Sequence, residues 1–171
     1  MTVVQSTVTV EPLPWTDSAA NDGTPFVIQV HGASLSTKRQ EQVPSWLTAN
    51  GNTTTDGSKA TRYLIRDGQL SSANGGSYLS TTANVPYGPM ALSSNLGTIS
   101  ITFSIKGGAL NWTNSAFVDG VARFFKTPAN AVNNVEILAR FNGPIDSAWT
   151  PVLLFAVPGT LEMGHATVFC R

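Results

Sequence analysis

The stretch Gly97-Thr98-Ile99-Ser100-Ile101-Thr102-Phe103-Ser104-Ile105-Lys106 alternates apolar and polar residues over most of its length. A period of two is typical of a half-buried β-strand, because successive side chains of a strand point to opposite faces of the sheet. The stretch is the clearest strand signal in the chain. It predicts one continuous strand whose buried face carries Ile99, Ile101, Phe103 and Ile105.

Further strands are predicted where β-branched and aromatic residues gather between turn signals such as Asp67-Gly68 and Asn74-Gly75-Gly76. One short helix is predicted over Ser36–Val43, with Ser36 as its N-cap and Pro44 ending it. The other predicted strands cover residues 2–10, 26–30, 61–66, 117–125, 135–141, 152–157 and 165–170.

This order of elements predicts an all-β fold, an antiparallel β-sandwich of jelly-roll type with one short helix. The strands follow one another at short spacing, without the helical crossovers that parallel strands would need. No internal repeat or linker divides the 171 residues. Residues 1–171 are therefore expected to form a single β-sandwich domain.

The composition favours a folded protein with few surface charges. Hydrophobic residues make up 42% of the chain and charged residues 12%, whereas disordered chains combine low hydrophobicity with high net charge. The 10 basic and 10 acidic residues balance, and the basic ones are scattered. Because nucleic-acid binding depends on clustered Lys and Arg, direct nucleic-acid binding is not expected. No apolar run approaches the length of a membrane span.

Catalytic and metal-binding patterns are weak, so the chain is not expected to be an enzyme. His31 and Ser34 allow one alternative, a serine hydrolase with Asp17 or Asp22 as the acid. The glycine pattern that surrounds the nucleophile in many hydrolases is incomplete there. One cysteine and two distant histidines lack the spacing of zinc ligands, so no metal site and no cofactor are predicted.

Aromatic residues beside turns favour a binding surface. Trp46 stands two residues after Pro44, Tyr87 follows Pro86, and Trp112 follows the Gly107-Gly108 bend. Trp and Tyr rings combine a broad apolar face with a polar tip. Trp46, Trp112 and Tyr87 are therefore the predicted ligand-binding residues of a carbohydrate-binding or other recognition module.

The composition also suits contacts between identical copies, because a surface without net charge does not repel its own kind. Phe124 and Phe125 are adjacent, so on a strand they face opposite sides. At least one of them can be buried against a neighbouring copy, or else between two sheets. Both are predicted interface residues of a homo-oligomer.

The layout of the chain resembles the coat proteins of small icosahedral RNA viruses and the projecting domains attached to them. The resemblance lies in the opening Ser6–Val10, the strand Gly97–Lys106, and the closing segments Pro151–Val157 and Gly159–Val168. It implies a jelly roll that self-assembles and attaches to a host receptor or glycan. Such shell proteins usually carry a basic arm, and Met1–Val10 contains no basic residue, which favours an outward-facing domain.

The first prediction is therefore a viral structural protein, a capsid protein or a capsid-projecting domain located in the virion. A carbohydrate-binding or other recognition module of β-sandwich type is the alternative, with a secreted or extracellular location. A serine hydrolase using His31 and Ser34 is the second alternative.

Overall fold

The computed structural model describes residues 16–32, 44–132 and 134–158. Within these residues it contains one α-helix, one 3₁₀ turn and eleven strands. In chain order they are α1 (Asp17–Asn21), β1 (Phe26–Gly32), β2 (Ser45–Leu47), β3 (Thr53–Thr54), the 3₁₀ turn (Gly57–Lys59), β4 (Tyr63–Arg66), β5 (Gln69–Ser72), β6 (Tyr87–Pro89), β7 (Phe103–Lys106), β8 (Ala109–Trp112), β9 (Arg123–Lys126), β10 (Ile137–Arg140) and β11 (Thr150–Pro158).

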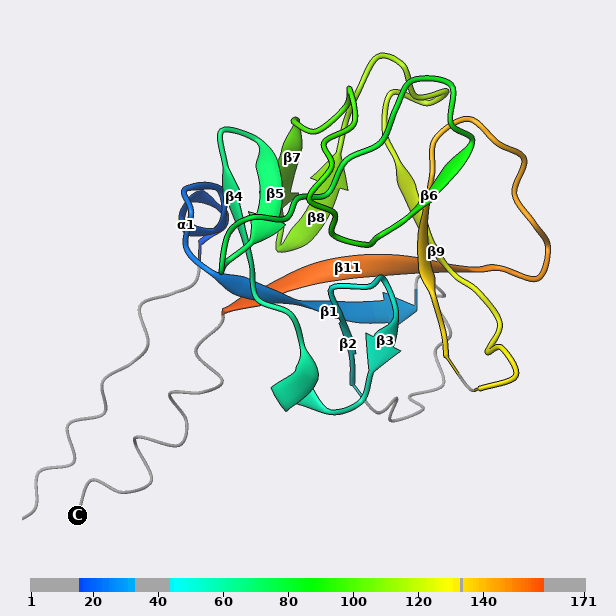
Figure 1. The fold of residues 1–171 in the computed structure, drawn as a ribbon, viewed down its shortest axis with the longest axis horizontal. Helices are drawn as coiled ribbons and strands as arrows, with labels where there is room; N and C mark the ends of the chain where they lie inside the picture. Colours follow the sequence, from blue (N-terminus) through cyan, green and yellow to red (C-terminus); the bar gives the residue numbers. More distant parts are fainter. Residues whose placement is uncertain (1–15, 33–43, 133, 159–171) are drawn as a thin grey trace, which may run out of the picture.

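The strands form one antiparallel sheet organised about β1 and β11, which lie side by side across the molecule (Figure 1). All seven residues of β1 pair with β11, from Phe26 opposite Pro158 to Gly32 opposite Val152. Beyond β1 come β2 and β3, and beyond β11 come β9, β10 and β6. The hairpins β4–β5 and β7–β8 branch from β1 and β11. The predicted all-β antiparallel class is confirmed, and the jelly-roll topology stays a prediction.

The sheet encloses one apolar core, to which each strand contributes alternate residues. Phe26, Ile28 and Val30 of β1 belong to the core, as do Val152, Leu154 and Ala156 of β11. The residues between them, such as Gln29 and Phe155, point to the opposite face, which we call the outer face of the sheet. Alternation in two central strands thus separates the core from a candidate binding surface.

Trp112 lies at the centre of the core. Its indole stacks on Phe103, with ring centroids 4.3 Å apart, and meets the rings of Phe117 and Phe141 edge-on. The indole N–H donates to the Ile101 carbonyl oxygen at 3.2 Å. Only 1% of Trp112 is exposed. The predicted ligand-binding role is therefore corrected: Trp112 is a packing residue, because its ring has no free face for a ligand.

The stretch 97–106 is not one continuous strand. Thr102 has a φ of 76°, which interrupts the extended backbone, and β7 begins only at Phe103. The interruption turns Ile101 outward, where it is 53% exposed, while Ile99 and Ile105 remain buried. The prediction of one buried isoleucine face was wrong at Ile101, because strict alternation holds only while the backbone stays extended.

The described helix is not the predicted one, since Ser36–Val43 lies outside the described residues, as do the predicted strands 2–10 and 165–170. In α1 the Thr16 side chain caps the first turn by accepting from the Ala19 amide at 3.2 Å. Asn21 then bonds the backbone of β7, donating to the Ile105 carbonyl at 3.0 Å and accepting from the Ile105 amide at 2.7 Å. A five-residue helix depends on such tertiary contacts.

The hairpins β4–β5 and β7–β8 share one construction. In each, a strand with the order aromatic, any residue, Ile, basic is joined by two turn residues to a strand with Leu second. Asp67, Gly68, Gly107 and Gly108 all have positive φ, as type I′ turns require. No internal repeat is predicted from the sequence, and this short one becomes visible when the two paired hairpins are compared.

Candidate functional site

The outer face of the sheet carries a group of partly exposed aromatic and polar side chains. We name the group the aromatic face and define it as Trp46, Gln29, His31, Leu153 and Phe155. Gln29 pairs with Trp46 on β2 and with Phe155 on β11, and His31 pairs with Leu153. Residues directly opposite on antiparallel strands point to the same side. The five side chains therefore project together from three adjacent strands.

His31 organises the middle of the aromatic face. Its Nε2 atom lies 2.8 Å from the Gln29 side-chain oxygen, and its ring meets the Phe155 ring edge-on with centroids 4.9 Å apart. An amide oxygen only accepts, so Nε2 is the donor in this contact. Leu153 is 46% exposed and adds an open apolar surface beside His31.

The loop after β3 packs against Trp46. Trp46 is paired with Thr54 across β2 and β3, and the chain then turns back so that Gly57 approaches the indole. A Cβ atom placed on Gly57 would lie 3.5 Å from Trp46 Nε1. The edge of the indole is thus bordered by backbone, and Trp46 as a whole stays partly exposed.

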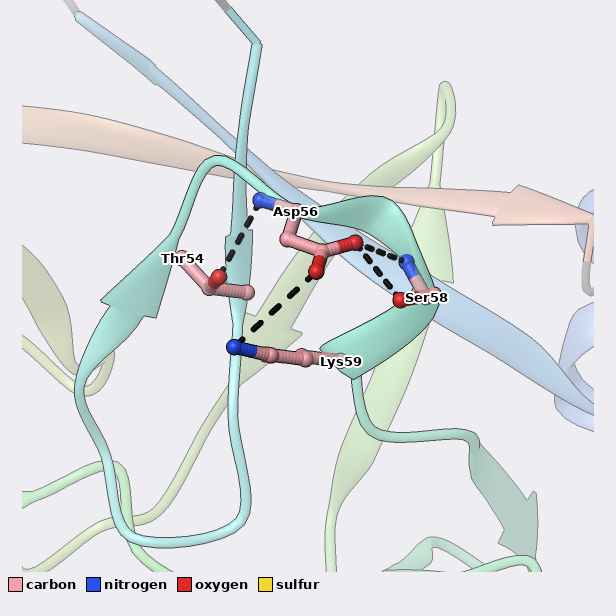
Figure 2. Close-up of polar contacts among 4 residues, drawn as sticks. All are labelled: Thr54, Asp56, Ser58 and Lys59. Carbon is pink, nitrogen blue, oxygen red and sulfur yellow. Dashed lines mark hydrogen bonds and ion pairs between the residues drawn. The ribbon is translucent and has the colours of Figure 1, made fainter.

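Local hydrogen bonds shape this loop (Figure 2). The Asp56 carboxylate accepts from the Ser58 amide at 3.0 Å and from the Ser58 hydroxyl at 2.6 Å, and it lies 4.0 Å from the Lys59 ammonium. The Asp56 amide donates to the Thr54 hydroxyl oxygen at 3.1 Å. The bonds from Ser58 hold the pKa of the Asp56 carboxyl below its ordinary value. The loop beside Trp46 therefore has a defined shape and carries a charged carboxylate at neutral pH.

A second aromatic cluster lies toward β6 and β9. Trp149 meets Tyr87 edge-on with centroids 4.9 Å apart and lies 6.0 Å from Phe125. The Tyr87 hydroxyl donates to the Pro144 carbonyl. A Cβ atom on Gly143 would lie 2.3 Å from the Tyr87 ring. Tyr87, a predicted ligand-binding residue, is thus engaged in packing and in a hydrogen bond within the chain, and it lies outside the aromatic face.

The two predicted interface residues are both buried within one chain. Phe124 is 7% exposed and belongs to the core, and Phe125 is 3% exposed on the opposite side of β9, beside Trp149. They face opposite sides as predicted, since they are consecutive in a strand. The interface role is corrected, because neither ring is open to a neighbouring copy.

The predicted hydrolase residues are only partly described. Ser34 lies outside the described residues, and His31 is paired with Gln29. The Asp17 carboxylate accepts from the amides of Gly107 and Gly108 at 2.7 and 3.0 Å, which stabilises the β7–β8 turn. In residues 16–32, 44–132 and 134–158, no three His, Cys, Asp or Glu side chains gather as metal ligands would. No helix in that same part of the chain is long and apolar enough to cross a membrane.

A family profile described as "Domain of unknown function (DUF7908)" matches residues 21–160. The chain belongs to the DUF7908 family. The DUF7908 match contains every strand from β1 to β11 and the whole aromatic face. No curated protein and no solved structure matches the chain. The resemblance of this DUF7908 chain to viral coat proteins stays a prediction from the sequence.

Of the aromatic face, only Trp46 is predicted from the sequence as a ligand-binding residue. From the sequence, His31 is either a strand-end or interface residue or the catalytic alternative, and no role is predicted for Gln29 or Phe155. Both residues lie within predicted strands, and Gln29 is the one polar residue of Phe26–Val30. Which of the two faces is buried was not readable from alternation alone.

Proposed function

We propose that this DUF7908 domain is a non-catalytic recognition module that binds neutral oligosaccharides through the aromatic face. The observation that carries the proposal is one row across the sheet, in which the Gln29 amide stands between the Trp46 and Phe155 rings. A sugar ring has an apolar C–H face that packs on an aromatic ring, and its hydroxyls exchange hydrogen bonds with amides and imidazoles. The row supplies both kinds of contact in alternation.

The spacing of the row favours a ligand longer than one sugar ring. Trp46 and Phe155 stand on the strands to either side of β1. Because neighbouring strands lie about 4.8 Å apart, the two rings are separated by about 10 Å. Two stacking positions at that distance fit two units of an extended chain, with one unit between them over Gln29, better than a single compact molecule.

The charge of the surface favours a neutral ligand. No member of the aromatic face is Asp, Glu, Lys or Arg, and the whole chain has 10 basic and 10 acidic residues. A polyanion would be bound mainly through clustered cations. The main competing occupant is a second copy of this chain, which the exposed Leu153 favours.

The test is the affinity of the whole chain for soluble neutral glucan and chitin oligosaccharides, measured by calorimetry. We expect Trp46→Ala and Phe155→Ala each to weaken binding about fivefold, because each removes one stacking contact of about 1 kcal/mol. Gln29→Ala should weaken it less, since one neutral hydrogen bond is lost. Leu96→Ala, at another exposed apolar side chain, is the matched control and should bind as the parent does.

The proposal fails if no neutral oligosaccharide binds. It also fails if Trp46→Ala and Phe155→Ala, both still folded, bind with the affinity of the parent chain. Sedimentation of the same samples tests the competing occupant, a second copy of this chain. A concentration-dependent dimer that Leu153→Asp abolishes would assign the aromatic face to contacts between copies.

A further inference from the structure

The β4–β5 hairpin carries an open depression of about 340 Å³, apart from the aromatic face. Its centre is a row of three residues on the outer face, because Ser71 pairs with Leu64 on one side and bridges to Tyr78 on the other. Leu64 and Tyr78 therefore form the walls and Ser71 the floor. The volume lies at the small end of the range for ligand sites, which fits a ligand of about one ring.

Ser71 places a buried hydroxyl group at the floor of this depression. It is 8% exposed, although its side chain points away from the core. Among the described residues, none makes a hydrogen bond with its hydroxyl group. A buried hydroxyl without a partner costs free energy. A ligand hydroxyl that enters the depression and reaches its floor would recover part of that cost.

The rim of the depression is polar and carries one positive charge. Arg66 and Gln69 are paired at the end of the hairpin, and Asn74 lies in the turn that follows β5. The Arg66 side chain crosses close to Gly23, where a Cβ atom would lie 2.6 Å from Arg66 Nε. No carboxylate of the described chain forms an ion pair with Arg66. A guanidinium in this position matches the geometry of a carboxylate, which it can bind through two hydrogen bonds.

We propose that this depression binds a single sugar ring that carries a carboxylate, as in a uronic acid unit. The C–H face of the sugar packs on Tyr78, one ring hydroxyl bonds the Ser71 hydroxyl, and the carboxylate pairs with Arg66. The amides of Gln69 and Asn74 are placed for the remaining hydroxyls. The inference extends the proposed glycan recognition to a second site, on strands away from β2 and β3 (Figure 1).

The experiment is a titration of the isotope-labelled whole chain with methyl glucuronide, followed by amide chemical shifts, with methyl glucoside as the neutral control sugar. We expect saturable shifts in residues 64–78 with the glucuronide and at least tenfold weaker binding of the glucoside. Arg66→Gln should bring the two sugars to equal affinity. Ser71→Ala and Tyr78→Ala should each weaken the binding of the glucuronide several-fold, and the amide spectrum of each variant shows whether it remains folded.

Trp46→Ala separates this inference from the proposed function. It should leave the glucuronide shifts unchanged, even if neutral oligosaccharides no longer bind. The inference is overturned if the glucuronide produces no saturable shifts in residues 64–78. Equal affinity for both sugars in the parent chain, or unchanged affinity in Ser71→Ala and Tyr78→Ala, would overturn it as well.

Discussion

At the scale of the residue, the same side-chain type has opposite roles in different places. Trp46 and Trp112 both stand beside turns in the sequence, yet Trp112 fills the core and Trp46 lies on the outer face. The difference arises from partners remote in sequence. Trp112 meets the rings of Phe103, Phe117 and Phe141, which three different segments bring together.

Tyr63 is the buried residue with the clearest electrostatic consequence. Its side chain is fully buried, and its hydroxyl donates to the Thr48 carbonyl oxygen at 3.2 Å. Burial raises the pKa of the Tyr63 phenol above its ordinary value. The neutral phenol is therefore strongly favoured in the folded state.

We expect this burial to make the protein lose stability at high pH. Above about pH 10 the phenol ionises in the unfolded chain but stays neutral in the folded one, so the free energy of unfolding falls as pH rises. Tyr63→Phe should cost about 1 kcal/mol at pH 7, because it removes one hydrogen bond. It should also flatten the alkaline slope. Urea unfolding of both chains between pH 7 and 11 measures this, and parallel slopes would contradict the assignment.

At the scale of the element, tertiary contacts override the local sequence pattern where the predicted strand Gly97–Lys106 is interrupted. The alternation over Gly97–Lys106 is regular in the sequence, but the backbone leaves the extended region at Thr102. There the Ile101 carbonyl accepts from the Trp112 indole and the Phe103 amide donates to Gly68. These partners come from β8 and from the β4–β5 turn, so no window of local sequence contains them.

Asn21 is expected to carry much of the stability of α1 and of the free edge of β7. Asn21→Ala removes both hydrogen bonds to the Ile105 backbone and should lower the free energy of unfolding by about 2 kcal/mol. Asn21→Asp keeps the acceptor and loses the donor, so its loss should be intermediate. The control is Asp22→Ala at the exposed neighbouring position. Chemical denaturation ranks the free energies of unfolding of the three variants. Equal losses of stability at positions 21 and 22 would refute the role of the Asn21 hydrogen bonds.

At the scale of the whole molecule, the β1–β11 ladder is the structural centre. It has seven residue pairs and is flanked by β2 and β4 on one side and by β8 and β9 on the other. Its inner residues belong to the core, and its outer residues form most of the aromatic face. Core stability and the candidate binding surface therefore depend on the same two strands.

Amide hydrogen exchange should show that β1 and β11 are more stable than the strands at the ends of the sheet. We expect the paired amides of β1 and β11 to exchange only through global unfolding, since neighbours cover both strands. Amides of β3 and β6, at the two ends of the strand path, should exchange faster because they open locally. The measurement is native-state exchange followed by two-dimensional NMR. Slower amide exchange in β6 than in β11 would contradict the prediction that the β1–β11 ladder is the most stable part of the sheet.

The sequence by itself determined the all-β class, the strands near residues 26–30, 61–66, 135–141 and 152–157, and the Asp67-Gly68 turn. Alternation and turn chemistry are properties of consecutive residues, so they can be read without the fold. Only the tertiary structure decided which face of each strand is buried, that Trp46 joins Gln29 and Phe155, and that Ser71 lies between Leu64 and Tyr78. Strand pairing sets these neighbours, and pairing joins residues that are far apart in the chain.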